Sequence, residues 1–173
     1  MRRLSLNARA MQDDASTAEV YVVLFEIAHP SLPAPIRLST DPTERLSTEP
    51  LLYGTRSSWA GADPATEPYL WILASALLPS DQEDAPAEGR IVLEALDPGV
   101  GRLMRSFTSF ATLRLAVVLA SSPDLVEAEW ADLRITSAEA SGGEVVVAFS
   151  REEVEQEMLP ALRFTRDRFP ALP

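Results

Sequence analysis

The residues of this 173-residue chain that could do chemistry do not combine into a catalytic set. His29 is the only histidine and cysteine is absent, which excludes thiolate metal sites, cysteine nucleophiles and a two-histidine metal site within one chain. A Ser-His-Asp triad could use only His29, which stands before Pro30 where a strand is expected to end. We therefore interpret His29 as a residue of a turn.

Three other stretches could suggest a catalytic or ligand site. Asp81, Glu83 and Asp84 lie in DQEDAPAEG, which lacks the residue order of a calcium loop. The four glutamates within 152–157 fit the charged face of a helix, and the glycines of 97–101 do not follow a phosphate-binding pattern. The sequence therefore predicts no metal, no cofactor and no enzymatic activity.

The three tryptophans offer a different chemistry, because their rings could stack on sugars. Trp59, Trp71 and Trp130 fall one in each expected strand, which favours packing in a core or an interface. Glycan binding stays open as an alternative.

Composition limits the partners. All 15 cationic residues are arginines, and with 26 acidic residues the net charge is −11, so the chain should repel a phosphate backbone. The chain is 46% hydrophobic, enough for a core, but its apolar runs are far shorter than the ~18 residues of a membrane helix. We expect one domain, without nucleic-acid binding or membrane insertion.

The elements that must position these residues are organised around 19–40. The pattern predicts a strand over Glu19–Ala28, ended by His29 and Pro30, and a return strand over Ile36–Ser39, which together form an antiparallel hairpin. The first strand is apolar on both faces and needs cover on both, either from a second layer of its own domain or from a neighbouring subunit. The residues proposed for a subunit contact here are Tyr21, Val23 and Phe25.

Further elements follow from periodicity and turn residues. Leu4, Ala8 and Met11 predict a short helix capped by Ser5 or Asn7, residues 41–50 read as polar turn, and 97–108 reads as a packing helix. A three-stranded meander is expected over 111–149, with a bulge near Ala131. The other predicted strands are Leu51–Trp59, a possible edge, and Arg90–Leu96. Tyr69–Leu78 is long enough for a helix, but its flanking prolines and its aromatic and isoleucine content favour a strand.

These elements indicate a mainly β fold, α+β at most: a two-layer antiparallel β-sandwich or partly open barrel with one packing helix and extended terminal arms. The single domain 1–173 divides into an N-terminal helical arm, 1–18, a β core, 19–149, and a C-terminal arm, 150–173. The last segment has apolar anchors separated by arginines, and we expect it to lie in a groove of its own chain or the next. Its proposed interface residues are Arg163, Phe164, Arg166, Arg168, Phe169 and Leu172.

Residues 5–40, SLNARAMQDDASTAEVYVVLFEIAHPSLPAPIRLST, resemble the opening of a family of short tail proteins of long-tailed bacteriophages and prophages. The similarity resumes in RLAVVLASSPDLVEAEW at 114–130 and in RFTRDRFPALP at 163–173, whereas 51–64 and 94–104 depart from the family pattern. The matching positions of the first segment are Ser5, Ala8, Arg9, Glu19, Val20, His29, Pro30, Pro33, Pro35, Ile36 and Arg37.

The resemblance implies a structural, non-enzymatic protein of the tail tip or baseplate, a distal tail protein whose ring joins the end of the tail tube to the hub. It implies as partners copies of the chain itself, in a ring of sixfold or threefold symmetry with sixfold preferred, and the neighbouring tail tube, tape-measure and hub proteins. The expected location is the virion tail, and the host cytoplasm during assembly. The alternative is a carbohydrate-binding or hydrolytic accessory of the tail tip.

Overall fold

The computed structural model describes residues 5–77, 89–94, 109–141 and 144–151. In these residues the chain is mainly β, with one α-helix, as the sequence predicts. The elements are α1 (Leu6–Asp13), β1 (Tyr21–Ala28), β2 (Ile36–Ser39), β3 (Glu44–Thr48), β4 (Leu51–Thr55), the 3-10 turn η1 (Trp59–Gly61), β5 (Tyr69–Trp71), β6 (Leu73–Leu77), β7 (Gly89–Glu94), β8 (Thr112–Leu119), β9 (Ser122–Ser141) and β10 (Glu144–Arg151).

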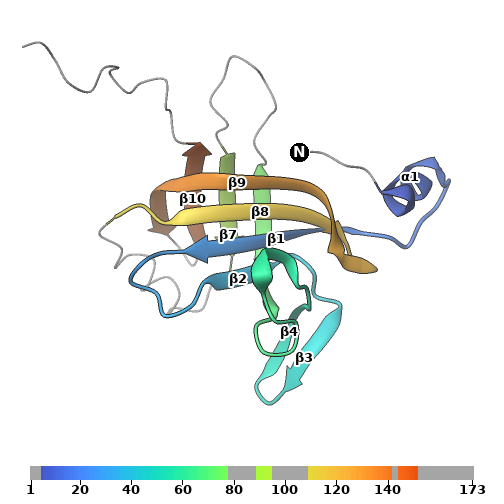
Figure 1. Cartoon of the computed structure of the whole chain (residues 1–173), viewed down its shortest axis with the longest axis horizontal. Coiled ribbons are helices and arrows are strands. Elements are labelled where there is room, and N and C mark those ends of the chain that lie inside the picture. The colour runs from blue at the N-terminus through green and yellow to red at the C-terminus, as the bar shows by residue number, and fades with distance from the viewer. Residues whose placement is uncertain (1–4, 78–88, 95–108, 142–143, 152–173) are drawn as a thin grey trace, which may run out of the picture.

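The strands form one curled sheet in the order β3-β4-β5-β2-β1-β8-β9-β10-β7-β6, which makes a half-barrel. Among these pairings only β2 with β5 is parallel, so the sheet is mixed and not fully antiparallel as expected. Figure 1 shows β7 and β10 crossing behind β1, β8 and β9, so that the two parts of the sheet face one another as two layers.

The link between β5 and β6 explains the curl. Six strands lie between them in the sheet order, yet only Ile72 separates them along the chain. The backbone N–H of Ile72 donates to the carbonyl of Ser39 at 2.9 Å, which fixes the link beside the end of β2. The sheet must therefore bend round until its β6 edge returns to the neighbourhood of β5.

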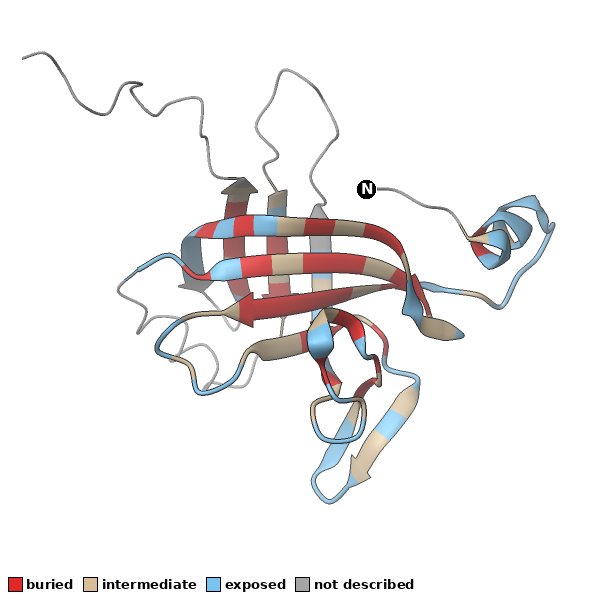
Figure 2. Ribbon diagram, in the orientation of Figure 1, coloured by how far each residue is buried: buried red, intermediate tan, exposed pale blue. Residues whose placement is uncertain are grey.

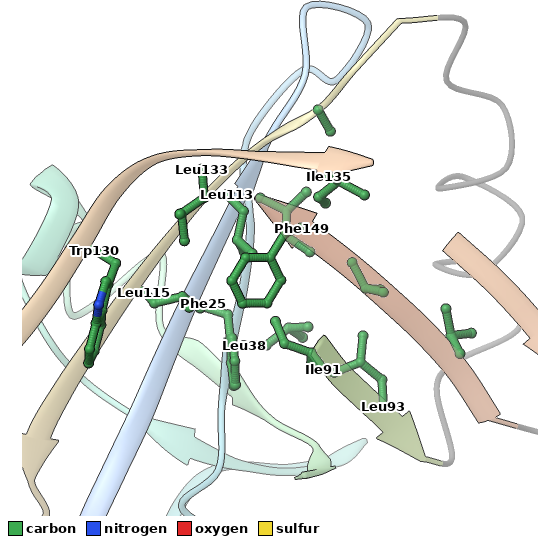
Figure 3. Packing of buried hydrophobic residues seen from close by; sticks show 14 of the residues in the cluster. Phe25, Leu38, Ile91, Leu93, Leu113, Leu115, Trp130, Leu133, Ile135 and Phe149 are labelled. Carbon is green, nitrogen blue, oxygen red and sulfur yellow. The ribbon is translucent and has the colours of Figure 1, made fainter. Parts of the chain in front are cut away.

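The larger core fills the inside of this bend. Phe25, Leu113, Leu115 and Phe149 are each at most 1% exposed and point toward one another from three strands (Figures 2 and 3). Ile91 and Leu93 of β7 complete the packing from the crossing layer. The alternation of Val145, Val147 and Phe149 predicted to face inward is confirmed.

A second, smaller core covers the outer face of the same strands. Val22 and Leu24 of β1, together with Ala116 and Val118 of β8, pack under the segment that carries Trp59 and Ala62. Because β1 and β8 are buried on both faces, their sequences are almost continuously apolar. The cover that β1 needs on both sides thus comes largely from its own chain.

The N-terminal helix is confirmed, and its cap is Ser5. The Ser5 side chain accepts a hydrogen bond from the Ala8 N–H at 3.1 Å, and Ala8 is fully buried. The backbone N–H of Ser5 donates to Glu127 Oε2 at 2.7 Å, which ties the start of α1 to β9.

The predicted hairpin and meander are confirmed. β1 pairs antiparallel with β2, and β8, β9 and β10 follow as neighbours. The bulge expected near Ala131 lies between the pairs Leu113–Leu133 and Leu115–Trp130, where Asp132 adopts φ 57°.

Three sequence expectations were wrong in detail. Residues 41–50, read as polar turn, contain β3, because a polar strand can pair at a sheet edge without an apolar face. The strand predicted over Leu51–Trp59 ends at Thr55 and is not the edge, and the one predicted over Tyr69–Leu78 is divided at Ile72. The predicted helix 97–108 lies outside the described residues.

The backbones of β4 and β5 approach closely at Gly54, and a substitution there tests this contact. An added Cβ would lie 2.0 Å from the Tyr69 carbonyl oxygen, so the backbones must separate. We expect Gly54→Ala to lower the free energy of unfolding by about 3 kcal/mol. Gly61→Ala is the matched control, since its Cβ meets nothing within 4 Å and only its φ of +76° opposes it, at a cost of about 1 kcal/mol. Equal losses in urea unfolding would contradict the close approach.

Candidate functional site

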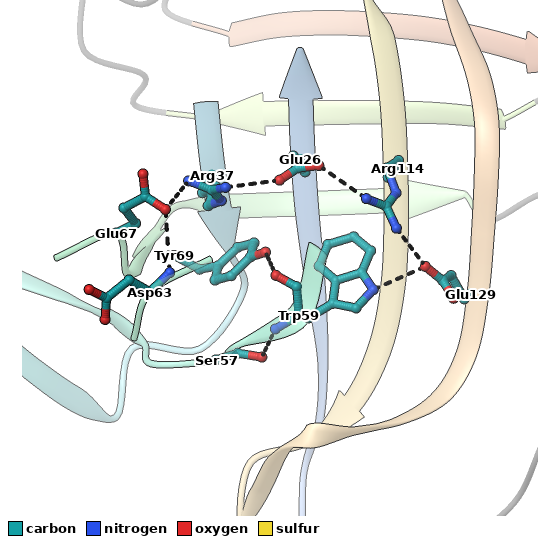
Figure 4. A network of polar contacts seen from close by, with 9 residues as sticks. All are labelled: Glu26, Arg37, Ser57, Trp59, Asp63, Glu67, Tyr69, Arg114 and Glu129. Carbon is teal, nitrogen blue, oxygen red and sulfur yellow. Dashed lines mark hydrogen bonds and ion pairs between the residues drawn. The ribbon is translucent and has the colours of Figure 1, made fainter. Parts of the chain in front are cut away.

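A chain of ion pairs crosses the outer face of the sheet and is the clearest polar site in the described part of the chain (Figure 4). Arg37 Nη1 lies 3.1 Å from Glu67 Oε2, and Arg37 Nη2 lies 3.3 Å from Glu26 Oε2. Arg114 Nη1 lies 3.5 Å from Glu26 Oε1, and Arg114 Nη2 lies 3.2 Å from Glu129 Oε1. We call these five residues the ion-pair chain.

The sheet register creates this arrangement. Glu26 of β1 stands directly opposite Arg37 of β2 on one side and Arg114 of β8 on the other. Opposite charges in facing positions stabilise neighbouring strands. Glu26 continues the outer face of Val22 and Leu24, so its carboxylate lies beside the smaller core and is only 6% exposed.

Trp59 joins the ion-pair chain to the segment that covers the smaller core. Its Nε1–H donates to Glu129 Oε1 at 3.1 Å, and the Arg114 guanidinium carbon lies 5.4 Å from the centroid of its ring. The Tyr69 ring also contacts the indole, with ring centroids 5.8 Å apart, and its hydroxyl donates to the Trp59 carbonyl at 2.8 Å. The segment is therefore held by both charge and packing.

Asp124, near the start of β9, holds the start of the same segment. Asp124 Oδ1 accepts hydrogen bonds from the Ser58 N–H at 2.6 Å, the Ser58 hydroxyl at 2.8 Å and the Ser57 hydroxyl at 3.3 Å. These bonds, the one from the Ser58 N–H first, lower the pKa of Asp124 below its ordinary value. Asp124 lies in the stretch 114–130 that resembles the tail-protein family.

The ion-pair chain is suited to holding strands together. Each of its carboxylates faces a guanidinium, so its charges are used in internal pairs. Within the described ranges, no group of three or more His, Asp or Glu side chains could hold a metal ion. The arrangement orders Trp59 and its segment on the sheet.

His29 follows β1 directly, as predicted, and joins two loops. The Ser31 N–H donates to His29 Nδ1 at 3.1 Å, so Nδ1 accepts and the proton of the neutral ring lies on Nε2. Nε2 lies 2.9 Å from Ser109 Oγ and in this tautomer donates to it. These hydrogen bonds connect the loop after β1 with the residues before β8.

The three predicted interface residues of β1 differ in how far they are buried. Phe25 is 1% exposed inside the larger core, so the expectation that it contacts another subunit was wrong: its own chain already covers it. Val23 is half-buried and packs against that core, and Tyr21 is 36% exposed. The structure does not describe Arg163, Phe164, Arg166, Arg168, Phe169 and Leu172, whose proposed contacts remain predictions.

The tryptophans divide in the same way. Trp59 and Trp130 are buried, at 8% and 9% exposure, so neither offers an open ring to a sugar. Trp71 is 43% exposed. Packing within the chain therefore explains two of the three tryptophans, Trp59 and Trp130.

Sequence reasoning missed a set of exposed apolar side chains on β4, β5 and β6. Gly54 is paired with Leu70, which places Leu52 and Leu70 as diagonal neighbours on one face. Trp71 and Leu73 follow on either side of the buried Ile72. The sequence feature that could have predicted these exposed side chains is two pairs of consecutive apolar residues, at 51–52 and at 70–71, because neighbouring residues of a strand point to opposite faces. We call the set the apolar edge: Leu51, Leu52, Leu70, Trp71 and Leu73, with exposures from 37% to 60%.

Comparison with known proteins gives no assignment: no protein-family model matches the chain, and no curated protein matches it. In the part of the chain that the structure describes, no helix has the length and apolar character to cross a membrane.

Substituting the two arginines of the ion-pair chain should have unequal effects. Arg37→Met should lower the free energy of unfolding by about 3 kcal/mol, because the Arg37 side chain is 10% exposed and its loss leaves buried Glu26 with one partner. Arg114→Met should cost about 1 kcal/mol, because that side chain is 39% exposed and solvent screens its pairs. Urea unfolding of both variants would measure the difference, and a larger loss for Arg114→Met would contradict the assigned burial.

Burial raises the pKa of Tyr69 to about 12, and the nearby Glu26 charge adds to this effect. A pKa above the unfolded value of 10.0 means that the neutral hydroxyl contributes stability below pH 10, and that this contribution is lost as the pH rises toward about 12. Tyr69→Phe should be less stable at neutral pH because it lacks the hydrogen bond to Trp59. Its difference from the wild type should shrink through this alkaline range in urea unfolding. A difference that stays constant would contradict the account.

Proposed function

We propose that this chain is a structural subunit of a bacteriophage tail tip or baseplate, where copies form a ring that joins the end of the tail tube to the hub. The apolar edge carries the proposal. Its five side chains, on β4, β5 and β6, are each 37% to 60% exposed, whereas the two cores bury most apolar side chains of β1 and β8. Apolar clusters of this kind mark contacts with other proteins.

Several positions that resemble the tail-protein family have structural roles in the fold, and these roles support a structural function. Ser5 caps α1, Ala8 packs it, and Arg37 pairs with Glu26 and Glu67. Asp124 holds the Trp59 segment through Ser57 and Ser58. These four positions stabilise the fold, which is compatible with a structural protein.

A ring follows from the kind of contact. In the proposed ring the apolar edge meets a different surface of the next copy, because a head-to-tail contact of this kind closes into a ring when its rotation permits, whereas a contact between two identical edges would give a dimer. We favour sixfold symmetry over threefold. The tail tube, tape-measure and hub proteins would then contact the two faces of the ring.

Exposed Trp71 is the observation that keeps carbohydrate binding as a second candidate. One open indole ring can stack on a sugar, but the described residues beside it in β5 and β6 are apolar, as a protein contact requires. A glycan array would separate the two: specific glycan binding that Trp71→Ser abolishes would favour the accessory role.

The apolar edge should determine the native mass of the pure chain. Mass photometry of the wild type should give a ring of several copies. Leu70→Ser combined with Trp71→Ser should shift it to monomers with little change in folding, because both side chains are already 40% and 43% exposed. Leu125→Ser, at a side chain 48% exposed on β9, is the matched control and should keep the ring. A wild-type chain that is strictly monomeric at all concentrations would count against the proposal.

A further inference from the structure

The sheet has two terminal strands, β3 and β6, and they differ in how they meet solvent. A terminal strand has unpaired backbone N–H and C=O groups along one side, to which another strand can bind. Proteins commonly block this by charges, bulges or prolines on the strand.

β3 has such protection. Its register with β4 shifts between Arg45 and Ser47, which is a bulge. Arg45 is exposed, and Glu44 forms an ion pair with Arg56. A strand that approached β3 would meet an irregular backbone and charged side chains.

β6 lacks these features. Its sequence is LASAL, without charge or proline, and all five residues pair in regular register with β7, from Leu73 opposite Glu94 to Leu77 opposite Arg90. No described strand pairs with its other side. Leu73 is 53% exposed, and Trp71 continues the apolar edge beyond it.

We propose that the free side of β6 binds the C-terminal segment of a second copy of this chain, with residues 162–172 added as an extended strand. The proposal rests on the proposed ring and names the contact that would build it. Backbone hydrogen bonds to β6 would provide binding, and alternate side chains of the added strand would reach the apolar edge.

The length and origin of the segment allow this contact. β10 ends at Arg151, two strands away from β6 in the sheet, a distance of ~10 Å. Residues 152–173 could extend over roughly 70 Å, which is enough to leave one copy and reach another.

The charge and composition of the segment also fit. Residues 163–173 contain three arginines and one aspartate, a net side-chain charge of +2, whereas the whole chain has a net charge of −11. A cationic segment is therefore attracted to the acidic body of a neighbour. Leu162, Phe164 and Phe169 supply apolar side chains for Leu73 and Trp71.

A second copy explains more than the segment of the same chain would. One added strand covers the side of β6 and its nearest apolar neighbours, but the apolar edge continues to Leu51 and Leu52 of β4. Only the body of another molecule, arriving with its C-terminal segment, would cover both parts.

The absence of cysteine makes a direct test possible. Ser75→Cys places a thiol at an exposed position in the middle of β6, and Thr165→Cys places one in the C-terminal segment. A tagged Thr165→Cys chain is mixed with an untagged Ser75→Cys chain, both full length, and treated with a short bismaleimide cross-linker. Thr48→Cys on β3 replaces Ser75→Cys in the control, and unchanged thermal unfolding of each variant verifies its folding.

We expect a cross-linked pair of one tagged and one untagged chain, with a yield on the order of tenfold above the β3 control because binding raises the local thiol concentration. Equal yields at β6 and β3 would overturn the inference. So would a link that forms only within one chain of the Ser75→Cys/Thr165→Cys double variant, which would assign the segment to its own β6. A ring seen by mass photometry without the β6 link would leave the proposed function standing and remove this contact alone.

Discussion

The one-residue connection at Ile72 determines the form of this molecule. β5 pairs with β2 and β4 in one part of the sheet, while β6 pairs with β7 at its far end. Because a single residue joins them, the intervening strands must curl, and the curl creates an inner and an outer face. The larger core, the smaller core and the exposed position of the apolar edge all follow from that bend.

The two faces are stabilised by different means. Inside, the side chains around Phe25 and Phe149 pack without charged groups, so burial of apolar surface dominates. Outside, the smaller core is bordered by Glu26 between Arg37 and Arg114, and by Asp124, which accepts hydrogen bonds from Ser57 and Ser58. These polar contacts hold one particular segment, with Trp59, over the sheet.

Sequence reasoning found what depends on local pattern. The alternation in β8 and β10, the Ser5 cap and the bulge near Ala131 each follow from residues close together in the chain. It missed what depends on register between distant strands. Glu26, Arg37 and Arg114 look like isolated charges until β1 lies between β2 and β8, and Phe25 looked available to a neighbour until β7 and β10 crossed it. The polar β3 was missed because its pairing with β4 needs no apolar face.

Most apolar side chains of β1 are buried within the chain itself, so an assembly would use a different surface. A strand with two apolar faces suggested that neighbours complete its cover, yet Val22 and Phe25 are covered within the chain. Five of the exposed large apolar side chains of the described residues lie on β4, β5 and β6 and not on β1.

The central claim is that the chain is part of a phage tail tip, and its location in particles tests this most directly. Electron microscopy of tailed phage particles obtained from the source of this sequence, labelled with a gold-conjugated antibody against the chain, would measure that location. The account predicts label at the distal end of the tail, on the ring between tube and hub. Intact tailed particles that contain none of this chain would contradict it.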